Sequence, residues 1–206
     1  MQKISILDCT LRDGGYVNGF QFGENVIKEI IQKLGQSTID IIECGFLVKD
    51  ANDKNQTLFG NVCSIEKVIG EKHSQVMYVA MLQLGKFDEA MVETCTGNSI
   101  DGIRISFHKN EIEAGLKYAR LLKKKGYKIF LQPVGTTSYS DKELLELIEE
   151  VNCIKPYAFY LVDTLGVMYK KDVLSMFYLV DRNLDSQIQI GFHTHNNLQL
   201  SFTNAQ

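Results

Sequence analysis

The amino-acid sequence predicts an α/β protein of the TIM (β/α)8-barrel type, and three observations lead to this fold class. Short apolar stretches typical of buried strands alternate with longer stretches whose apolar residues recur at helical spacing. The strand-like stretches return about every 30 residues, which is the size of one βα unit. Charged and polar residues gather directly after these stretches, at the strand ends where barrel enzymes carry their active sites.

Length and composition indicate one globular domain, which we assign to residues 1–206. The sequence is 45% hydrophobic and 23% charged, as is usual for globular proteins. The formal net charge of −3 gives no sign of a polyanion partner, and the basic cluster Lys123–Lys125 is interpreted as the solvated end of a helix. Nucleic acid is therefore not an expected partner.

The expected location is the cytoplasm, with no membrane partner. Met1–Ile4 leads directly into a strand, and no apolar run approaches the ~18 residues of a membrane span. The five cysteines are an odd number without CxxC spacing, which favours free thiols in a reducing compartment. Cys9 and Cys44 adjoin candidate site residues, and we interpret both as small packing residues.

Seven strands are expected, each a short run dominated by apolar residues. They cover Ile4–Asp8, Ile39–Glu43, Val76–Leu82, Ile100–Phe107, Lys128–Val134, Ala158–Val162 and Ile188–His193. The first strand runs into the loop Thr10–Tyr16, in which Gly14 and Gly15 mark a tight turn.

The helices alternate with these strands, and their apolar residues recur at spacings of three and four. In Asn25–Leu34 the pattern stops at Gly35, a residue that commonly ends helices. In Asp141–Val151, Asp141 is the expected N-cap, and a buried stripe follows it. The other expected helices cover Ser64–Ile69, Phe87–Cys95, Glu111–Lys125, Lys171–Val180 and a segment from Leu198 onward.

A doubly wound open sheet and a closed barrel both fit this succession of elements, and the positions of the polar residues favour the barrel. These residues follow or end strands one, two, six and seven, and they are Arg12, Asp13, Glu43, Asp163, His193 and His195. Only a barrel brings all of these strand ends onto one rim.

His193 and His195 stand at the end of the seventh strand. Strand side chains alternate with a period of two, so both imidazoles should lie on one face, close enough to hold one metal ion. Asp13 is the natural third ligand, and two His with one Asp leave positions open for a substrate. The alternative interpretation is a pair of ordinary polar residues at a strand end.

Arg12, next to Asp13, is a candidate for stabilising negative charge that develops on a substrate oxygen. Glu43 ends a buried strand, where an unpaired carboxylate would be costly, so it should have a cationic partner, and Arg12 is the natural one. Purely structural ion pairs are the alternative for both residues.

Three segments resemble the motifs of the DRE-TIM metallolyases, the HMGL-like superfamily, and they are Asp8–Gly14, Ile41–Glu43 and Gly191–Asn197. The superfamily includes 4-hydroxy-2-oxovalerate aldolase, 3-hydroxy-3-methylglutaryl-CoA lyase, isopropylmalate synthase and homocitrate synthase. The resemblance covers essentially all 206 residues in strand order. Ile103–His108 looks most like the aldolase branch, and Asp163–Gly166 fits the end of the family's sixth strand.

The resemblance implies a metal-dependent aldolase that cleaves a 4-hydroxy-2-oxo acid to pyruvate, or a related 2-oxo acid, and an aldehyde. Asp13, His193 and His195 are the implied ligands of a divalent metal, which would chelate the substrate's carboxylate and keto oxygens and stabilise an enolate. Mixed nitrogen and oxygen ligands suit Mn²⁺ or Mg²⁺, with Co²⁺ and Zn²⁺ as further candidates.

The resemblance also implies roles for residues that do not bind the metal. Arg12 would stabilise the enolate and Glu43 would orient Arg12, while Asp163 and Thr164 are candidate substrate-binding residues. The aldolases carry a histidine base two residues after the glycine of the Arg-Asp-Gly motif, where this chain has Tyr16.

Tyr16 and His108 are the candidates for the proton-transfer role that this histidine fills. A tyrosine of unperturbed pKa near 10 is a poor base at neutral pH unless its environment lowers that pKa. His108 could act as a base from the fourth strand, and the alternative for it is a polar residue at a strand end.

Other functions remain open at this point. A Claisen-type enzyme that condenses an acyl-CoA with a 2-oxo acid would share the metal and Arg12 but normally needs a further C-terminal region. A catalytically weak barrel that binds a metabolite or a protein is a third hypothesis. A metal-dependent hydrolase is disfavoured, because amidohydrolases carry the His-x-His pair on the first strand. A homo-oligomer is also compatible with the sequence.

The sequence supplies seven strands, whereas eight βα units of about 30 residues make a barrel of roughly 240 to 250 residues. We therefore expect the barrel to be truncated, with the eighth βα unit missing. Strands one and seven would then carry unpaired backbone edges, and the metal should be weakly held.

Overall fold

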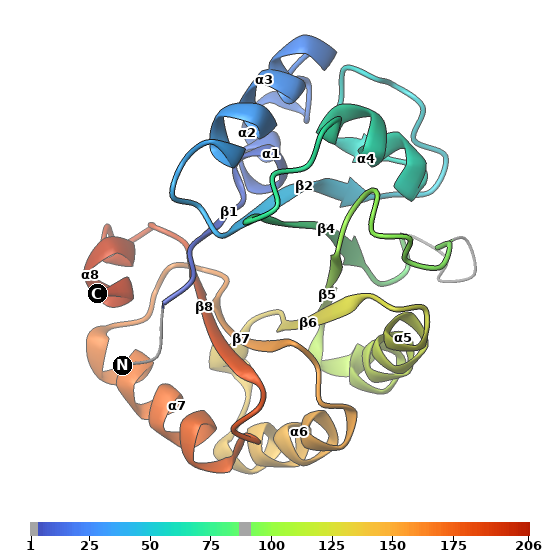
Figure 1. The fold of residues 1–206 in the computed structure, drawn as a ribbon. Coiled ribbons are helices and arrows are strands. Elements are labelled where there is room, and N and C mark those ends of the chain that lie inside the picture. Colours follow the sequence, from blue (N-terminus) through green and yellow to red (C-terminus); the bar gives the residue numbers. More distant parts are fainter. Residues whose placement is uncertain (1–3, 87–91) are drawn as a thin grey trace. The chain divides into compact units, whose positions relative to one another are not determined.

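The computed structural model describes residues 4–86 and 92–206 of the chain. The chain divides into two compact units, one formed by residues 1–104 and 124–128 and the other by residues 105–123 and 129–206. Each unit consists of parallel strands with helices in the connections between them (Figure 1). Among the described residues, no helix is both long and apolar enough to cross a lipid bilayer.

The strands of the first unit pair in parallel in the order β1 (Leu7–Asp8), β2 (Ile41–Leu47) and β4 (Met77–Gln83), and the short β3 (Leu58–Phe59) pairs with β2. Helices α3 (Glu24–Gly35) and α4 (Val62–Ile69) lie on one side of β2 (Figure 1). The α4 helix begins where the Asn61 side chain accepts a hydrogen bond from the backbone N–H of Ser64 at 2.8 Å.

All seven residues of β2 are buried, as expected for a parallel strand that is covered on both faces. The register between β2 and β4 shifts between Glu43 and Phe46. Within this bulge Gly45 has a φ of +148°, and a Cβ there would collide with the carbonyl oxygen of Thr57. The glycine therefore lets β2 continue past Glu43, to Leu47, instead of ending at Glu43 as the sequence suggested.

The β5 strand (Gly102–Phe107) runs from the first unit into the second. In the second unit, β7 (Ala158–Asp163) pairs in parallel with β6 (Lys128–Pro133) and with β8 (Gln189–Thr194). The β7–β8 register is unbroken over six pairs, from Ala158 and Gln189 to Asp163 and Thr194.

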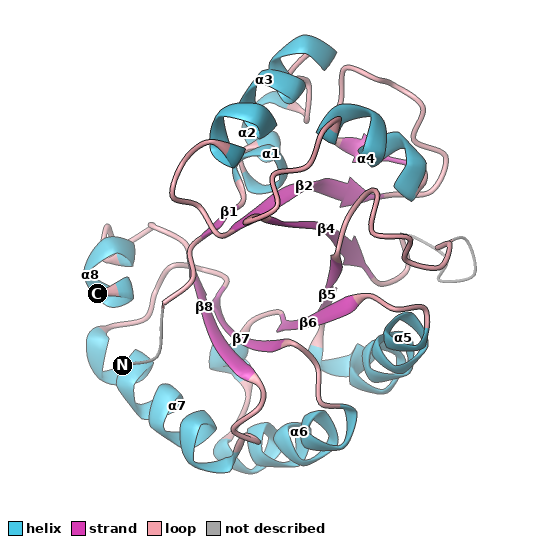
Figure 2. Cartoon of the chain, in the orientation of Figure 1, coloured by secondary structure: helices cyan, strands magenta, loops and turns pink. Residues whose placement is uncertain are grey.

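Four helices belong to the connections around these strands, namely α5 (Ile112–Lys124), α6 (Asp141–Ile154), α7 (Lys170–Asn183) and α8 (Ser201–Ala205). Figure 2 shows α6 and α7 along one side of β7 and β8. Parallel strands need such crossover connections, and the helices cover one face of each sheet segment.

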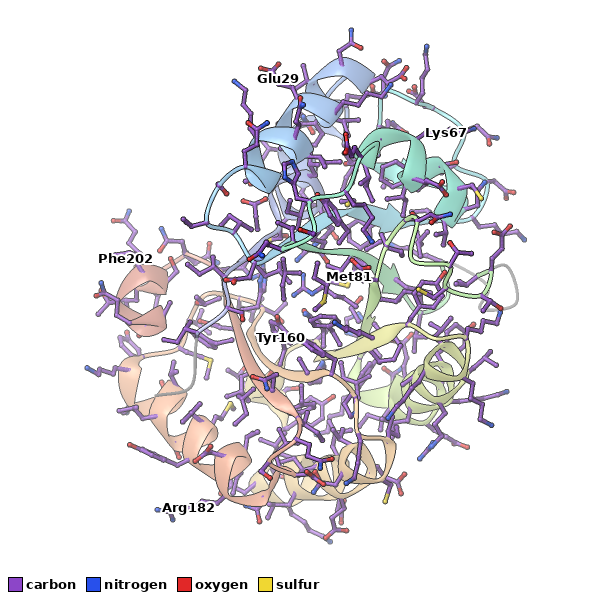
Figure 3. The ribbon with its side chains drawn as sticks, viewed as in Figure 1. Glu29, Lys67, Met81, Tyr160, Arg182 and Phe202 are labelled. Atoms are coloured by element: carbon purple, nitrogen blue, oxygen red, sulfur yellow. The ribbon has the colours of Figure 1, made fainter. Side chains whose placement is uncertain are left out.

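The apolar core lies between the helices and the strands, and charged helix residues extend into solvent. Met81 on β4 is 3% exposed, whereas Glu29, Lys67 and Arg182 project outward from α3, α4 and α7 (Figure 3). This division matches the apolar stripes on which the helix predictions depended.

All seven expected strands are present in the expected order, with ends that differ by a few residues. The first strand is shorter than predicted, because regular pairing covers only Leu7–Asp8. The tight turn predicted at Gly14 and Gly15 is wrong. Gly14 has helical dihedrals and links two short helical turns, α1 (Thr10–Asp13) and α2 (Gly15–Asn18).

Three helix predictions also need correction. Residues 92–95 of the expected helix Phe87–Cys95 are not helical, and its residues 87–91 lie outside the described part of the chain. The N-cap of α6 is Ser140 and not Asp141, because the Ser140 and Glu143 side chains each bind the other's backbone N–H. The last helix begins at Ser201, three residues after the predicted start at Leu198.

Candidate active site

Asp8, at the end of β1, organises the segment that carries Arg12 and Asp13. Its carboxylate accepts hydrogen bonds from the backbone N–H and from the hydroxyl of Thr10, each at 3.0 Å. The chain then turns into α1, which places Arg12 and Asp13 directly after the strand. A Cβ at Gly14 would lie 2.5 Å from the carbonyl oxygen of Thr10, so a glycine is required for this close approach.

Arg12 connects the α1 turn to β2 through buried ion pairs. Its Nε donates to Oε2 of Glu43 at 2.8 Å, and its Nη1 donates to Oδ1 of Asp13 at 2.7 Å. The partnership of Arg12 with Glu43 that the sequence predicted is therefore confirmed. The Glu43 side chain is fully buried, and that of Arg12 is 7% exposed.

Arg104 is a second cationic partner of Glu43, one that the sequence analysis did not identify. Its Nη1 lies 2.6 Å from Oε2 of Glu43, and the side chain is fully buried. A charged residue inside the apolar run Ile103–Ile105 was the available signal, because a buried strand carries a cation only when a carboxylate lies opposite it.

These charges stabilise one another electrostatically. Burial alone would raise the pKa of the Glu43 carboxyl, but the charges of Arg104 and Arg12 outweigh burial and hold that pKa below its ordinary value. For Arg12, burial acts to lower the pKa, while the carboxylates of Glu43 and Asp13 raise it above the ordinary value. Arg12 is thus a permanent cation fixed by two carboxylates.

Tyr16 lies on α2, in an edge-on aromatic cluster with Phe20 and Phe46. The ring centroids are 5.2 Å from Phe20 and 6.1 Å from Phe46. Partial burial raises the pKa of the Tyr16 hydroxyl above its ordinary value, and although Arg12 acts to lower that pKa, the net shift is upward. Tyr16 therefore holds its proton at neutral pH, which suits a proton donor and not a base.

The two cysteines near these residues are thiols and not thiolates at neutral pH. Burial, supported by the Glu43 carboxylate, raises the pKa of Cys9 to about 11. Cys44 is fully buried, and its pKa is raised by the same causes. These shifts agree with the interpretation of both residues as packing groups.

His193 and His195, in the second unit, stand close together as predicted. His193 belongs to β8 and His195 follows the strand, and their ring centroids are 4.9 Å apart. Nδ1 of His195 lies 3.2 Å from the carbonyl oxygen of Asp163. With the proton on Nδ1, the ring donates to this carbonyl and the lone pair is on Nε2, the tautomer found in most metal-binding histidines.

Asp163 holds together the two loops that follow β7 and β8. Its buried carboxylate accepts from the backbone N–H groups of Val167 and Met168 at 3.0 and 3.1 Å. Its carbonyl oxygen also accepts from the backbone N–H of His195 at 3.2 Å. Gly166, at a φ of +63°, lets the loops touch, because a Cβ there would lie 2.7 Å from the carbonyl oxygen of His195.

Thr164 and His108 are the other candidate residues of this unit, and each directly follows a strand. The Thr164 hydroxyl accepts a hydrogen bond from the backbone N–H of Gly135 at 2.8 Å, which links the loops after β6 and β7. His108 is exposed directly after β5, and its backbone N–H donates to the Glu111 carboxylate at 2.8 Å. Their roles in substrate binding and proton transfer stay predictions.

We expect Asp163→Ala to destabilise the loop that follows β7. The substitution removes the charged acceptor of two backbone hydrogen bonds, a partly buried one from the N–H of Val167 and a buried one from the N–H of Met168. Hydrogen bonds to charged groups contribute about 1.5–3 kcal/mol each, and the partly buried one should lie at the low end of this range. The free energy of unfolding in urea should therefore fall by about 3–4 kcal/mol in total. Asp181→Ala, at an exposed position of α7, is the control and should change the urea midpoint little. An equally small effect of both substitutions would contradict this assignment.

The candidate residues therefore form two groups. In the first unit the structure brings together Arg12, Asp13 and Glu43, with Arg104 added and Tyr16 on the adjoining turn. In the second unit it joins Asp163 to His195 and places His195 beside His193.

Comparisons with known proteins agree with this picture. The HMGL-like family model matches residues 3–206. The chain is 25% identical over 211 residues to a 4-hydroxy-2-oxovalerate aldolase of Geobacillus genomosp. 3, with 99% of the chain and 60% of that protein covered. It is also 25% identical over 208 residues to an oxaloacetate decarboxylase of Mycobacterium tuberculosis, with 97% of the chain and 59% of that protein covered.

Solved structures show the same fold. The HMG-CoA lyase of Bacillus subtilis aligns with a TM-score of 0.74 at 15% identity, covering 100% of the chain and 72% of the lyase. The carboxyl transferase domain of Rhizobium etli pyruvate carboxylase aligns with a TM-score of 0.77 at 13% identity, covering 100% of the chain and 37% of that protein. The fold is thus α/β of the TIM-barrel type, with seven principal strands.

The chain spans about 60% of the length of the curated relatives it matches. The family model nevertheless extends over nearly all of its residues, and the motifs that resemble the superfamily lie within the match. The chain belongs to the HMGL-like family.

Proposed function

We propose that residues 1–206 form the catalytic domain of a divalent-metal-dependent aldolase. The reaction is the cleavage of a 4-hydroxy-2-oxo acid to pyruvate, or a related 2-oxo acid, and an aldehyde. The observation that carries the proposal is the buried Arg12–Glu43–Arg104 cluster beside Asp13, because it fixes a permanent cation next to a candidate metal ligand. Relatives named 4-hydroxy-2-oxovalerate aldolase support the choice of substrate class.

The candidate metal ligands have the chemistry that a divalent cation needs. We assign Asp13, His193 and His195 to the metal, because imidazole nitrogens and a carboxylate are ligands of divalent metals and because the Asp163 carbonyl orients the His195 ring through Nδ1, as in most metal-binding histidines. Two nitrogen ligands and one carboxylate suit Mn²⁺ or Mg²⁺, and also admit Co²⁺ or Zn²⁺. When bound, such a metal acts as a Lewis acid toward the oxygens of a 2-oxo acid.

We assign Arg12 the role of stabilising the negative charge that develops on the substrate's keto oxygen. Its Nε and Nη1 are engaged by Glu43 and Asp13, and among the described residues no hydrogen bond is made by Nη2. Nη2 is therefore the donor that can face the substrate. Glu43 and Arg104 keep the guanidinium plane fixed, so little reorganisation is needed as the charge forms.

Cleavage also requires proton transfer at the 4-hydroxyl group. The base takes the hydroxyl proton as the carbon–carbon bond breaks, and a proton is later returned to the carbon of the enolate. We assign the donor role to Tyr16, because its pKa is raised by burial and it keeps its proton. His108 is the candidate base. Asp163 and Thr164 order the loop beside His195, and we propose that this loop closes the substrate site.

The test is an assay of the purified protein with Mn²⁺ and a panel of 4-hydroxy-2-oxo acids, with pyruvate as the measured product. Pyruvate that forms with Mn²⁺ and disappears with a chelator supports the aldolase. Oxaloacetate belongs in the panel, because loss of its carboxyl group also generates the enolate of pyruvate and one relative carries that name. Condensation that depends on a thioester would instead indicate the Claisen-type synthase, and no turnover with any substrate would favour a binding role.

Asp13→Asn should lower the affinity for Mn²⁺ by about 10-fold or more, because a neutral amide replaces an anionic ligand. The measurement is a Mn²⁺ titration followed by electron paramagnetic resonance. Asp181→Asn, on the exposed surface of α7, is the matched control. Unchanged Mn²⁺ affinity in Asp13→Asn would remove Asp13 from the ligand set.

A further inference from the structure

Gln132 is a buried polar residue on β6 whose side chain the mechanism above does not use. It is 3% exposed, and its amide nitrogen has no hydrogen-bond partner among the described residues. Burying an amide without a partner costs free energy, and an apolar residue of similar size such as methionine would avoid that cost. A glutamine at this position therefore calls for an explanation beyond packing.

The sheet register places Gln132 on the face that carries His193. Phe130 pairs with Ala158, and Val162 pairs with His193. Because side chains alternate along a strand, Gln132 shares the face of Phe130, and His193 shares the face of Ala158 and Val162. Gln132 and His193 thus belong to the same face of the same unit.

Tyr160 lies on this face between the two strands that carry these residues. Its ring centroid is 6.4 Å from that of Phe130, and a Cβ at Gly191 would lie 2.5 Å from the ring, so the ring covers the glycine. Figure 3 shows Tyr160 on β7. Two aromatic rings, those of Phe130 and Tyr160, therefore lie on the face that carries Gln132, and because Gln132 is shielded from water, any hydrogen bond that its amide makes is strengthened.

We propose that Gln132 determines substrate specificity by hydrogen bonding to a hydroxyl group on the aldehyde-derived part of the substrate. The proposal rests on the aldolase function, in which Arg12 and the metal ligands take the carboxylate and keto oxygens. A neutral amide both donates and accepts, which matches a hydroxyl group, whereas a second buried carboxylate would need a cation. The preferred aldehyde therefore carries a hydroxyl group next to its carbonyl carbon.

The experiment runs the reaction toward condensation, in which the methyl carbon of pyruvate loses a proton and bonds to the aldehyde carbon, whose oxygen gains one. Glycolaldehyde and propanal are the matched probes, because glycolaldehyde carries a hydroxyl group where propanal carries a methyl group. The wild-type enzyme should prefer glycolaldehyde by about 10-fold or more in kcat/KM. Gln132→Met should lower kcat/KM for glycolaldehyde by about 10- to 100-fold and leave the value for propanal within about 3-fold.

Gln189→Met is the matched control, because Gln189 is an exposed residue of β8 whose pairing with Ala158 places it on the same face. It should keep the wild-type preference. Exchange of the pyruvate methyl protons with deuterium from solvent, measured with Mn²⁺ and without aldehyde, should be the same in Gln132→Met as in the wild type.

The outcomes separate the two proposals. Proton exchange in the wild type without a preference between the aldehydes overturns the role of Gln132 and leaves the aldolase standing. Absence of exchange and of condensation in the wild type overturns the aldolase, and the role of Gln132 with it. If Gln132→Met does not fold, the preference of the wild type for glycolaldehyde over propanal still tests the proposal.

Discussion

Glu43→Gln is expected to lower the free energy of unfolding by about 3–5 kcal/mol, the cost of leaving buried charges without their partner. The substitution keeps the shape of the side chain but removes its charge, so the buried cations Arg12 and Arg104 lose the carboxylate that both contact. Urea unfolding followed by circular dichroism measures the change. Glu150→Gln, which weakens the exposed pair of Glu150 with Arg120, is the control and should leave the urea midpoint nearly unchanged.

The contribution of Glu43 to the free energy of unfolding should also decrease at low pH. Its pKa in the folded protein is lowered, so its stabilising contribution is fully present above the unfolded-state pKa of about 4.3 and is lost as the pH falls through the folded-state pKa. The difference in stability between the wild type and Glu43→Gln should therefore shrink below about pH 4. A difference that stays constant over this range would contradict the assigned charge state.

Two features of the candidate site could be predicted from the sequence, each from one physical rule. The spacing of two along a strand brought His193 and His195 together, and their centroids are 4.9 Å apart. The cost of burying a carboxylate predicted a cation for Glu43, and Arg12 contacts it at 2.8 Å. Strand alternation decides the first case, and the cost of burying an unpaired charge decides the second.

Features that depend on contacts between distant segments were not predictable in the same way. The second cation, Arg104, reaches Glu43 from a strand about 60 residues later in the chain, and no local pattern specifies that contact. The two glycines at Gly14 and Gly15 signalled a turn, but Gly14 is needed for its close approach to Thr10 and keeps helical dihedrals. Asp163 was a candidate for substrate binding, yet its carboxylate holds backbone N–H groups of its own loop.

Arg12 has a double role in this arrangement, since it belongs to the buried charge cluster and is also the proposed stabiliser of the enolate. A substitution that removes its whole side chain would mix the two roles. Arg12→Lys keeps the positive charge but loses the planar, forked donor groups that engage Glu43 and Asp13 and that leave Nη2 for the substrate. Glu43 retains its other partner, because Arg104 lies 2.6 Å from the same oxygen.

Arg12→Lys should therefore lower kcat of the proposed aldolase by about 10² or more, the scale of losing one donor to a developing oxyanion. The Mn²⁺ affinity should stay close to that of the wild type, because Arg12 is not a ligand and the local charge is unchanged. Arg120→Lys, at an exposed pair on α5, is the matched control and should retain full turnover. Turnover and Mn²⁺ affinity, measured on the same preparation, separate the two roles of Arg12. A parallel loss of both would mean that Arg12 only positions Asp13, whereas a loss of turnover alone places its guanidinium against the reacting oxygen.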